Sequence, residues 1–296
     1  MKKLLCFLLV SIFALSVFPS CNTPANASEP WPEANPAQEF AYELMSGDAA
    51  VRIRGYIGTE AKVVIPSEIE GKPVVSIDPG TDFSDPWSAV EELYIPSSVQ
   101  NIGNRAFDGA HGLLRVNFEK REQPIRIGYR AFAGCTGLEK LAVPQYAILG
   151  NRVFENCSGL REIFIPKTTI FRGYTVFSGC SSAEKMIFED GLSKLDIRGF
   201  FYGMTALKSI TLPASVSEIS DDVFCFFDGL ETVTFLGDAP KLLSDDPNAE
   251  LITNTSTSPQ EGERVTIYYD PATKGWDTFA YATWAYELVP LPSAKP

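Results

Sequence analysis

The sequence has a single histidine, His111, among its 296 residues. Zinc sites and Ser-His-Asp triads depend on histidine, so one histidine removes most arrangements of either kind. Positive charge is also scarce, because 37 acidic residues outnumber 25 Lys and Arg and give a formal net charge of −12. Nucleic acids and anionic lipid surfaces are both bound through Lys and Arg, so we expect neither as a side-chain partner.

Familiar catalytic motifs are missing as well. The chain contains no HExxH, no Gly-x-Ser-x-Gly and no Gly-x-x-x-x-Gly-Lys sequence, and its six cysteines form no Cys-x-x-Cys pair. Adjacent acids such as Asp221 and Asp222 point to different faces of a strand, which does not suit a pair of catalytic carboxylates. We therefore expect no enzyme, no metal site and no other cofactor.

The one long apolar run lies at the N-terminus. Lys2 and Lys3 precede an uncharged stretch that continues to Phe18. A run of this length is too short to span a bilayer comfortably and is typical of a secretory signal, so residues 1–20 are interpreted as a signal peptide. The protein is therefore expected to be exported.

Cys21 follows the apolar run directly. The sequence Phe-Pro-Ser-Cys resembles a bacterial lipobox, which makes Cys21 the candidate lipidated residue. Cleavage by ordinary signal peptidase near Ala27 is the alternative. Residues 21–38 are rich in Pro, Ala, Asn and Glu and are expected to form a flexible tether. The lipid would then be the only membrane contact and would hold the protein at the cell envelope, at the outer membrane or the cell surface.

A repeat of 22 to 25 residues fills most of the remaining chain. A phenylalanine recurs at spacings of 25, 22, 23, 24 and 23 residues, at Phe107, Phe132, Phe154, Phe177, Phe201 and Phe224. Three apolar positions follow it at fixed offsets, as at Leu138, Leu141 and Val143, and then Pro144. Such a period is the signature of stacked repeats, since one unit alone cannot bury its own apolar face.

The apolar spacing within each unit indicates strand rather than helix. Two apolar positions are separated by one residue, as in Ile163 and Ile165, which is the period of a strand with one face toward a core. Proline often follows and ends the strand, because it has no N–H for the ladder. A glycine before each Phe, such as Gly103 or Gly128, predicts a turn conformation that other residues avoid. The sequence thus predicts a β-rich solenoid of about seven coils over residues 63–236, with short parallel strands and little helix.

These repeats resemble a known family. The pattern Ile-Pro-x-x-Val-x-x-Ile-Gly-x-x-Ala-Phe-x-x-Cys-x-x-Leu is carried by residues 95–113 and 143–160 and is similar to the BspA-type leucine-rich repeat of bacterial surface proteins. Some units depart from the pattern: Pro is replaced by Glu119 and Glu189, Gly is lost near Asp196 and Ser220, and Leu is replaced by Ala183. These departures suggest local irregularity in the later coils. The resemblance implies a leucine-rich-repeat fold and a role in adhesion or in binding host proteins.

Both flanks of the repeats resemble caps of the same family. Alternating apolar residues on either side of a turn sequence indicate a hairpin within residues 39–62, which would cover the first coil. A further strand, followed by Trp276 and Trp284, indicates a C-terminal cap over residues 237–296. The polar stretch 245–263 has no apolar period and is expected to be a mobile loop.

Three cysteines share one position in the repeat. Cys135, Cys157 and Cys180 each follow a repeat Phe by three residues, so stacked coils place them in one internal column. A redox pair or metal site is one interpretation. A ladder of small buried thiols is the favoured one, because parallel columns seldom have disulfide geometry and Cys packs as a small apolar side chain. His111 lies in Gly109-Ala110-His111-Gly112, where other units have Cys or another residue, and is interpreted as a turn residue. No role is assigned to Cys225.

The residue between the two core positions of each strand points away from the core, because side chains alternate across a strand. This outward column reads Tyr94, Asn117, Ala142, Phe164, Ile187, Thr211 and Thr234. Aromatic and aliphatic residues on an exposed face are frequent anchors at interfaces, so Tyr94, Asn117, Phe164 and Ile187 form the candidate partner-binding face. The alternative is that they reflect only the β-propensity of an open sheet.

Three arginines precede the repeat Phe by two residues. Arg105, Arg130 and Arg152 would stack in successive coils, which makes them a candidate strip for an anionic ligand such as a sulfated or carboxylated glycan. Asp108 and Glu155 lie three residues after Arg105 and Arg152. Neutralisation by these acids is the simpler interpretation.

The leading hypothesis is a non-enzymatic, lipid-anchored surface protein whose solenoid binds another macromolecule. The expected partner is a protein of a host or its matrix, and the resemblance adds adhesion as the setting. The first alternative is a carbohydrate-binding accessory lipoprotein that uses the arginine strip and Trp87. The second is a structural spacer without a specific ligand.

Overall fold

The computed structural model describes residues 31–80, 87–197, 199–220, 223, 229–243, 265–277, 279 and 286–292. Several predicted features lie outside these residues, namely the signal peptide, the lipidation site Cys21, the tether as far as residue 30, the loop 245–263, Cys225 and Trp284.

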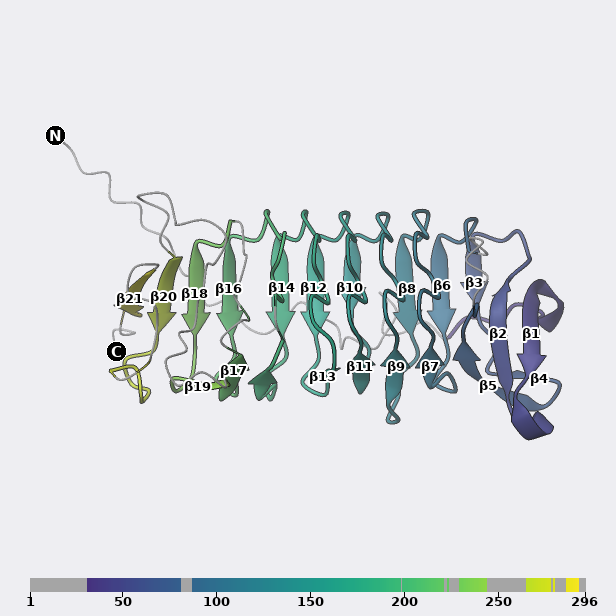
Figure 1. Ribbon diagram of the computed structural model, residues 1–296, viewed down its shortest axis with the longest axis horizontal. Helices are drawn as coiled ribbons and strands as arrows, with labels where there is room; N and C mark the ends of the chain where they lie inside the picture. The colour runs from purple at the N-terminus through teal and green to yellow at the C-terminus, as the bar shows by residue number, and fades with distance from the viewer. Residues whose placement is uncertain are drawn as a thin grey trace.

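Each coil contributes one strand to a first row of parallel strands along the long axis of the molecule (Figure 1). These strands are β3 (Lys62–Val64), β6 (Glu92–Ile95), β8 (Arg115–Phe118), β10 (Lys140–Ala142), β12 (Glu162–Ile165), β14 (Lys185–Phe188), β16 (Ser209–Leu212), β18 (Thr232–Phe235), β20 (Val265–Tyr269) and β21 (Tyr286–Pro290). Hydrogen bonds join these strands into three groups, β3-β6-β8, β10-β12-β14 and β16-β18-β20-β21. We call this row the first sheet.

The other half of each coil contributes to a second row, which we call the second sheet. Its strands are β5 (Lys72–Ile77), β7 (Asn101–Ile102), β9 (Ile125–Ile127), β11 (Ala147–Leu149), β13 (Ile170–Phe171), β15 (Lys194–Leu195), β17 (Glu218–Ser220) and β19 (Lys241–Leu243). The short strand β4 (Glu68–Ile69) pairs antiparallel with β5. The predicted β-rich solenoid with short parallel strands and little helix is confirmed.

An antiparallel hairpin covers the N-terminal end, as the sequence predicts. Strand β1 (Phe40–Leu44) pairs with β2 (Val51–Tyr56), and β2 pairs in parallel with β5 of the second sheet. The 3-10 turns η1 (Ala37–Glu39) and η2 (Ser46–Asp48) precede the two strands. The outermost coil edge is therefore paired rather than open.

Residues 31–38, which the sequence places in the tether, pack on the first sheet. The Asn35 side-chain oxygen accepts a hydrogen bond from the Val64 N–H at 2.7 Å, and the Asn35 N–H donates to the Val64 carbonyl at 3.0 Å. The Trp31 ring meets the Tyr94 ring edge to face at 5.5 Å. A flexible tether thus remains a prediction for residues 21–30 only.

The repeat array extends beyond residue 236, where the sequence places its end. Strand β20 pairs in parallel and in register with β18, and β21 pairs in the same way with β20. The predicted C-terminal strand is therefore a further rung of the first sheet, and the solenoid has about nine turns rather than about seven. Trp276 closes this end, with 4% of its surface exposed and its ring 5.1 Å from Phe235.

A column of aromatic rings runs through the core. Phe107, Phe132, Phe154 and Phe177 stack at centroid distances of 4.9, 5.4 and 5.3 Å with nearly parallel planes. Trp87 continues the column 4.8 Å before Phe107 and is 1% exposed. The core is thus continuous from coil to coil, and the alternative in which Trp87 binds carbohydrate is wrong because this side chain is buried.

The recurrence of glycine at the repeat positions of Gly103 and Gly128 has a different cause from the predicted turn conformation. Positive φ angles occur two residues later, at Arg105 (57°) and Arg130 (54°), and not at these two glycines. A Cβ at Gly128 would lie 2.9 Å from the backbone nitrogen of Asn104. Glycine is needed here because adjacent coils approach too closely for a side chain.

Candidate interaction surfaces

The outward column of the first sheet consists of three blocks of paired residues, one for each hydrogen-bonded group of strands. Register pairs align its members across neighbouring strands as Val64, Tyr94, Asn117, then Ala142, Phe164, Ile187, then Thr211, Thr234, Tyr268 and Val289. None of these ten residues is charged, whereas 21% of the whole chain is. We call this column the uncharged stripe.

Two of the predicted contact residues are covered rather than exposed. Tyr94 and Phe164 lie outside the core cluster, as the alternation predicts, but each is only 9% exposed. Trp31 and the Lys62 ammonium, 5.1 Å from the Tyr94 ring centroid, cover Tyr94. The prediction that Tyr94 and Phe164 are exposed anchors is therefore wrong.

The other two predicted contact residues remain accessible. Asn117 and Ile187 are partly exposed, and so is Ala142. Ala142 on β10 and Ile187 on β14 flank the covered Phe164 on β12, and Asn117 lies on β8, one strand beyond β10. The accessible centre of the uncharged stripe thus runs from Asn117 to Ile187.

Ion pairs between coils flank the uncharged stripe. Arg115 pairs with Glu92 at 2.9 Å, and Glu162 pairs with Lys140 at 3.3 Å and Lys185 at 2.9 Å. Burial alone would raise the pKa of Glu162, but the two ammonium groups outweigh it and lower the pKa below its ordinary value. Charges of both signs therefore lie beside the uncharged stripe and pair with one another between coils.

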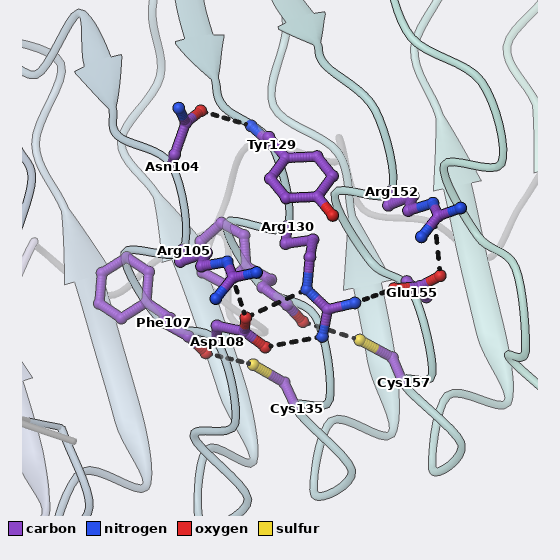
Figure 2. A network of polar contacts seen from close by, with 11 residues as sticks. Asn104, Arg105, Phe107, Asp108, Tyr129, Arg130, Cys135, Arg152, Glu155 and Cys157 are labelled. Carbon is purple, nitrogen blue, oxygen red and sulfur yellow. Dashed lines mark hydrogen bonds and ion pairs between the residues drawn. The ribbon is translucent and has the colours of Figure 1, made fainter. Parts of the chain in front are cut away.

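The three arginines of the predicted anionic-ligand strip form one chain of ion pairs with Asp108 and Glu155 (Figure 2). Arg130 donates to Asp108 at 3.1 and 3.2 Å and also binds Glu155 in the next coil. Arg105 lies 3.7 Å from Asp108, and Arg152 lies 3.6 Å from Glu155. The two acids therefore pair with all three guanidinium groups of the strip.

This network ties three successive coils together. The hydrogen bond to Asp108 is the main reason that the pKa of Arg130 lies above its ordinary value, so the guanidinium stays charged. Figure 2 also shows that the Asn104 side chain accepts the Tyr129 N–H, at 2.8 Å. Each of the three arginines already has a carboxylate partner, so the geometry favours a structural role over an anionic-ligand site.

The cysteine column is a ladder of free, buried thiols, as the favoured interpretation predicts. Cys135, Cys157 and Cys180 donate to the carbonyls of Phe107, Phe132 and Phe154 at 3.2, 3.1 and 3.3 Å. A hydrogen bond with Cys157 and burial raise the pKa of Cys135 well above its ordinary value, and burial does the same for Cys180. The raised pKa keeps the Cys135 and Cys180 thiols protonated, which suits hydrogen-bond donors between coils rather than nucleophiles.

His111 lies in an exposed turn, one residue after Ala110, which occupies the position equivalent to these cysteines. Its Nδ1 is 2.8 Å from the Gly134 carbonyl and 3.3 Å from the Thr136 hydroxyl. Within the described residues, no three His, Cys, Asp or Glu side chains converge as metal ligands would.

Two glutamates occupy the position where other units have proline, and each binds the preceding coil. Glu119 accepts hydrogen bonds from the Ser97 N–H at 2.7 Å and the Ser97 hydroxyl at 2.8 Å. Glu189 accepts from the Lys167 N–H at 2.9 Å. Glutamate in the proline position therefore caps the bend of the preceding coil, and local irregularity in the later coils stays a prediction.

Arg121 is a buried residue that the sequence analysis missed. It is 4% exposed and donates to the carbonyls of Val99 and Pro96 at 2.9 and 3.1 Å. Burial lowers its pKa to about 10, so it stays protonated at neutral pH. The 25-residue spacing of its unit, longer than the other four, was the available signal for an insertion here.

The sequence matches the family described as BspA type leucine-rich repeat region, in six copies over residues 83–198 and 125–244. Together these ranges cover more than half of the chain. The chain belongs to the BspA-type leucine-rich repeat family. The resemblance carried by the repeat pattern is thereby confirmed. Curated proteins yield no match.

Solved structures of other leucine-rich repeat proteins are similar to this member of the family. A leucine-rich repeat protein of T. pallidum (TpLRR) is 26% identical, with a TM-score of 0.52, and the similarity covers 69% of this chain and 86% of that one. A leucine-rich cell surface protein of Faecalibacterium prausnitzii is 17% identical, with a TM-score of 0.49, over 84% of this chain and 88% of that one. The first of these supports the leucine-rich repeat fold.

Of the described segments, none forms an apolar helix of the length needed to cross a bilayer.

Proposed function

We propose that this protein is a non-enzymatic, exported surface protein that binds an extended segment of another protein along its first sheet. The observation that carries the proposal is the uncharged stripe. Its ten residues lie on successive strands of the first sheet, and ion pairs between coils lie beside it. Binding sites typically combine an apolar centre with a polar rim. Asn117 and Ile187 are the accessible contact residues, and the covered Phe164 lies between them in the same column.

The setting we propose for this binding is the bacterial cell envelope. The apolar run before residue 20 and Cys21 after it support export and lipid anchoring, and a structurally similar protein of Faecalibacterium prausnitzii is described as a cell surface protein. An anchor at Cys21 would place the first coil close to the membrane, since only ten residues separate Cys21 from Trp31. We propose adhesion or host-protein binding as the biological role.

A binding screen of the purified full-length protein against host matrix proteins tests this proposal. For any matrix protein that binds in this screen, we expect the double variant Asn117→Glu/Ile187→Glu to weaken binding roughly tenfold or more, because the two substitutions place charge at the centre of the stripe. Ile57→Glu is the matched control, since Ile57 is 66% exposed and lies outside the stripe. Equal affinity of the double variant and its parent would exclude this face.

The carbohydrate alternative has lost its two supports. Trp87 is buried and the three arginines of the strip are paired. The same screen should therefore include glycans as a comparison, and retention of glycans alone would overturn the proposal. A spacer without a ligand would retain no protein of the panel above the level of the double variant.

A further inference from the structure

A second surface lies on the second sheet and has no place in the proposed function. We propose that Arg126, Ile148, Ile170 and Arg172 form a docking site for an acidic, extended polypeptide segment. We call these four residues the second-sheet patch. The inference is independent of the uncharged stripe, because the two surfaces belong to different sheets.

Strand register brings the patch together. Arg126 on β9 pairs with Ile148 on β11, and Ile148 pairs with Ile170 on β13. The residues on either side of Arg126 and of Ile148 are buried, so these two side chains point away from the core, and Ile170 continues their column. Neighbouring strands are about 4.8 Å apart, so the column spans about 10 Å.

Arg172 adds a second cation beside Ile170. Four residues lie between Leu149 and Phe154, whereas five lie between the register-equivalent Phe171 and Phe177, so this link carries one inserted residue. Arg172 begins the longer link, and its N–H donates to the Leu149 carbonyl at 2.8 Å. The insertion therefore places an exposed guanidinium next to the column without breaking the coil.

The two arginines of the patch differ from the others in the structure. The described residues include ten arginines, and the side chains of eight of them bind a carboxylate or a backbone carbonyl. These eight are Arg52, Arg54, Arg105, Arg115, Arg121, Arg130, Arg152 and Arg161. Arg126 and Arg172 have no ion pair or side-chain hydrogen bond to any residue of the described chain, and both are exposed. In a chain with a net charge of −12, unpaired positive charge at the two ends of one patch is available for an acidic partner.

Apolar exposure is concentrated at the same place. Eight large apolar or aromatic side chains are exposed in the described chain, and three of them, Tyr146, Ile170 and Tyr174, lie in adjacent coils at this sheet. Ile170 is 46% exposed and Ile148 is partly exposed beside it. Aliphatic groups between two guanidinium groups fit a polypeptide that alternates acidic and apolar side chains. A glycan would instead favour flat aromatic platforms at the centre of the site.

The probe follows from these dimensions. In an extended peptide, residues i, i+2 and i+4 share one side and span about 13 Å, which the flexible arginine side chains can match. The probe is a fluorescein-labelled peptide with Asp, Leu and Asp at these positions, and the comparison peptide has Lys in place of both Asp. Fluorescence anisotropy with the full-length protein measures binding at low salt.

We expect the acidic peptide to bind more tightly than the Lys peptide, and Arg126→Glu/Arg172→Glu to weaken its binding roughly tenfold or more. Ile170→Thr should also weaken it severalfold while keeping a β-branched residue in the strand. Arg115→Glu on the first sheet reverses a charge in the same way and should leave the affinity within about twofold. Thermal unfolding verifies that each variant is folded, and Ile170→Thr decides the question if the double variant is not.

Two results would overturn the inference. One is equal binding of the two peptides by the parent protein, or an affinity for the acidic peptide that Arg126→Glu/Arg172→Glu and Ile170→Thr leave unchanged. The other is binding of a sulfated oligosaccharide, but not of the acidic peptide, with loss in the double variant. Asn117→Glu/Ile187→Glu should leave peptide binding unchanged, so failure of this inference is distinguishable from failure of the proposed function.

Discussion

The side chain of Arg130 joins three coils. It binds Asp108 of the preceding coil and Glu155 of the following coil, although its own backbone is left-handed with φ at 54°. A non-glycine residue in this conformation costs of order 1 kcal/mol or more. Arg105 and Arg152 share the conformation, with φ at 57° and 56°. The ion pairs offset this cost where the side chains meet between coils.

We expect Arg130→Met to lower the free energy of unfolding by about 1–3 kcal/mol, because it leaves two half-buried carboxylates without their shared cation. Arg152→Met is the matched control, since Arg152 has the same backbone conformation and one pair at 3.6 Å to Glu155. It should cost under about 1 kcal/mol. Urea unfolding measures both, and equal losses would show that the network contributes nothing beyond ordinary surface pairs.

At the scale of the strand, charges on the first sheet are arranged across the ladder rather than along it. Glu162 on β12 lies between Lys140 on β10 and Lys185 on β14, its partners in the strand register. Opposite charges directly across neighbouring strands stabilise the pairing. The strands themselves are only three or four residues long here, so such pairs reinforce a short hydrogen-bond ladder.

This arrangement predicts a pH dependence. Because the pKa of Glu162 in the folded protein lies below its unfolded value of about 4.3, its stabilising contribution is complete above that value and is lost as the pH falls through the folded pKa. We expect Glu162→Gln to cost under about 1 kcal/mol at neutral pH, and the difference from the parent to shrink as the pH approaches about 3.

Urea unfolding between neutral pH and about pH 3 measures this effect. Glu184→Gln is the control, because the Glu184–Arg161 pair joins neighbouring coils as well but both its side chains are 63% exposed. It should cost less at neutral pH than Glu162→Gln does. A constant difference between Glu162→Gln and its parent at every pH would contradict the assigned role of the two lysines.

At the scale of the whole molecule, stability depends on contacts between neighbouring coils. The stacked rings from Trp87 to Phe177 form one column, and the cysteine thiols donate from each coil to the one before. In such arrays each unit contacts only its neighbours, so total stability is close to a sum of unit and interface terms. A defect in the middle coil therefore weakens two interfaces at once.

Phe154 occupies that middle position, 1% exposed and stacked on both Phe132 and Phe177. We expect Phe154→Ala to lower the free energy of unfolding by about 3–5 kcal/mol through lost burial and the cavity that remains. Leu114→Ala, at a residue that is 43% exposed, should change it by no more than about 0.5 kcal/mol. Urea unfolding followed by circular dichroism tests both, and similar losses would refute the column as a source of stability.

Much of this architecture follows from the sequence alone. The strand positions, the inward Phe and Cys columns, the N-terminal hairpin and the outward direction of the Asn117 and Ile187 side chains all come from local periodicity. A two-residue alternation and a fixed offset from Phe repeat in every unit, and the same backbone geometry is therefore repeated. The neutralisation of Arg105 by Asp108 was also accessible, since the two are three residues apart.

Other features depended on the tertiary structure, because they arise between segments that are distant in the chain. The burial of Tyr94 by Trp31 requires a segment 63 residues away to fold back on the first sheet. Arg130 finds acids in two other coils, whereas Arg126 and Arg172 find none in the described part of the chain. Which charge lies opposite which is set by the exact register of coils that differ in length by one to three residues, and periodicity alone does not contain that register.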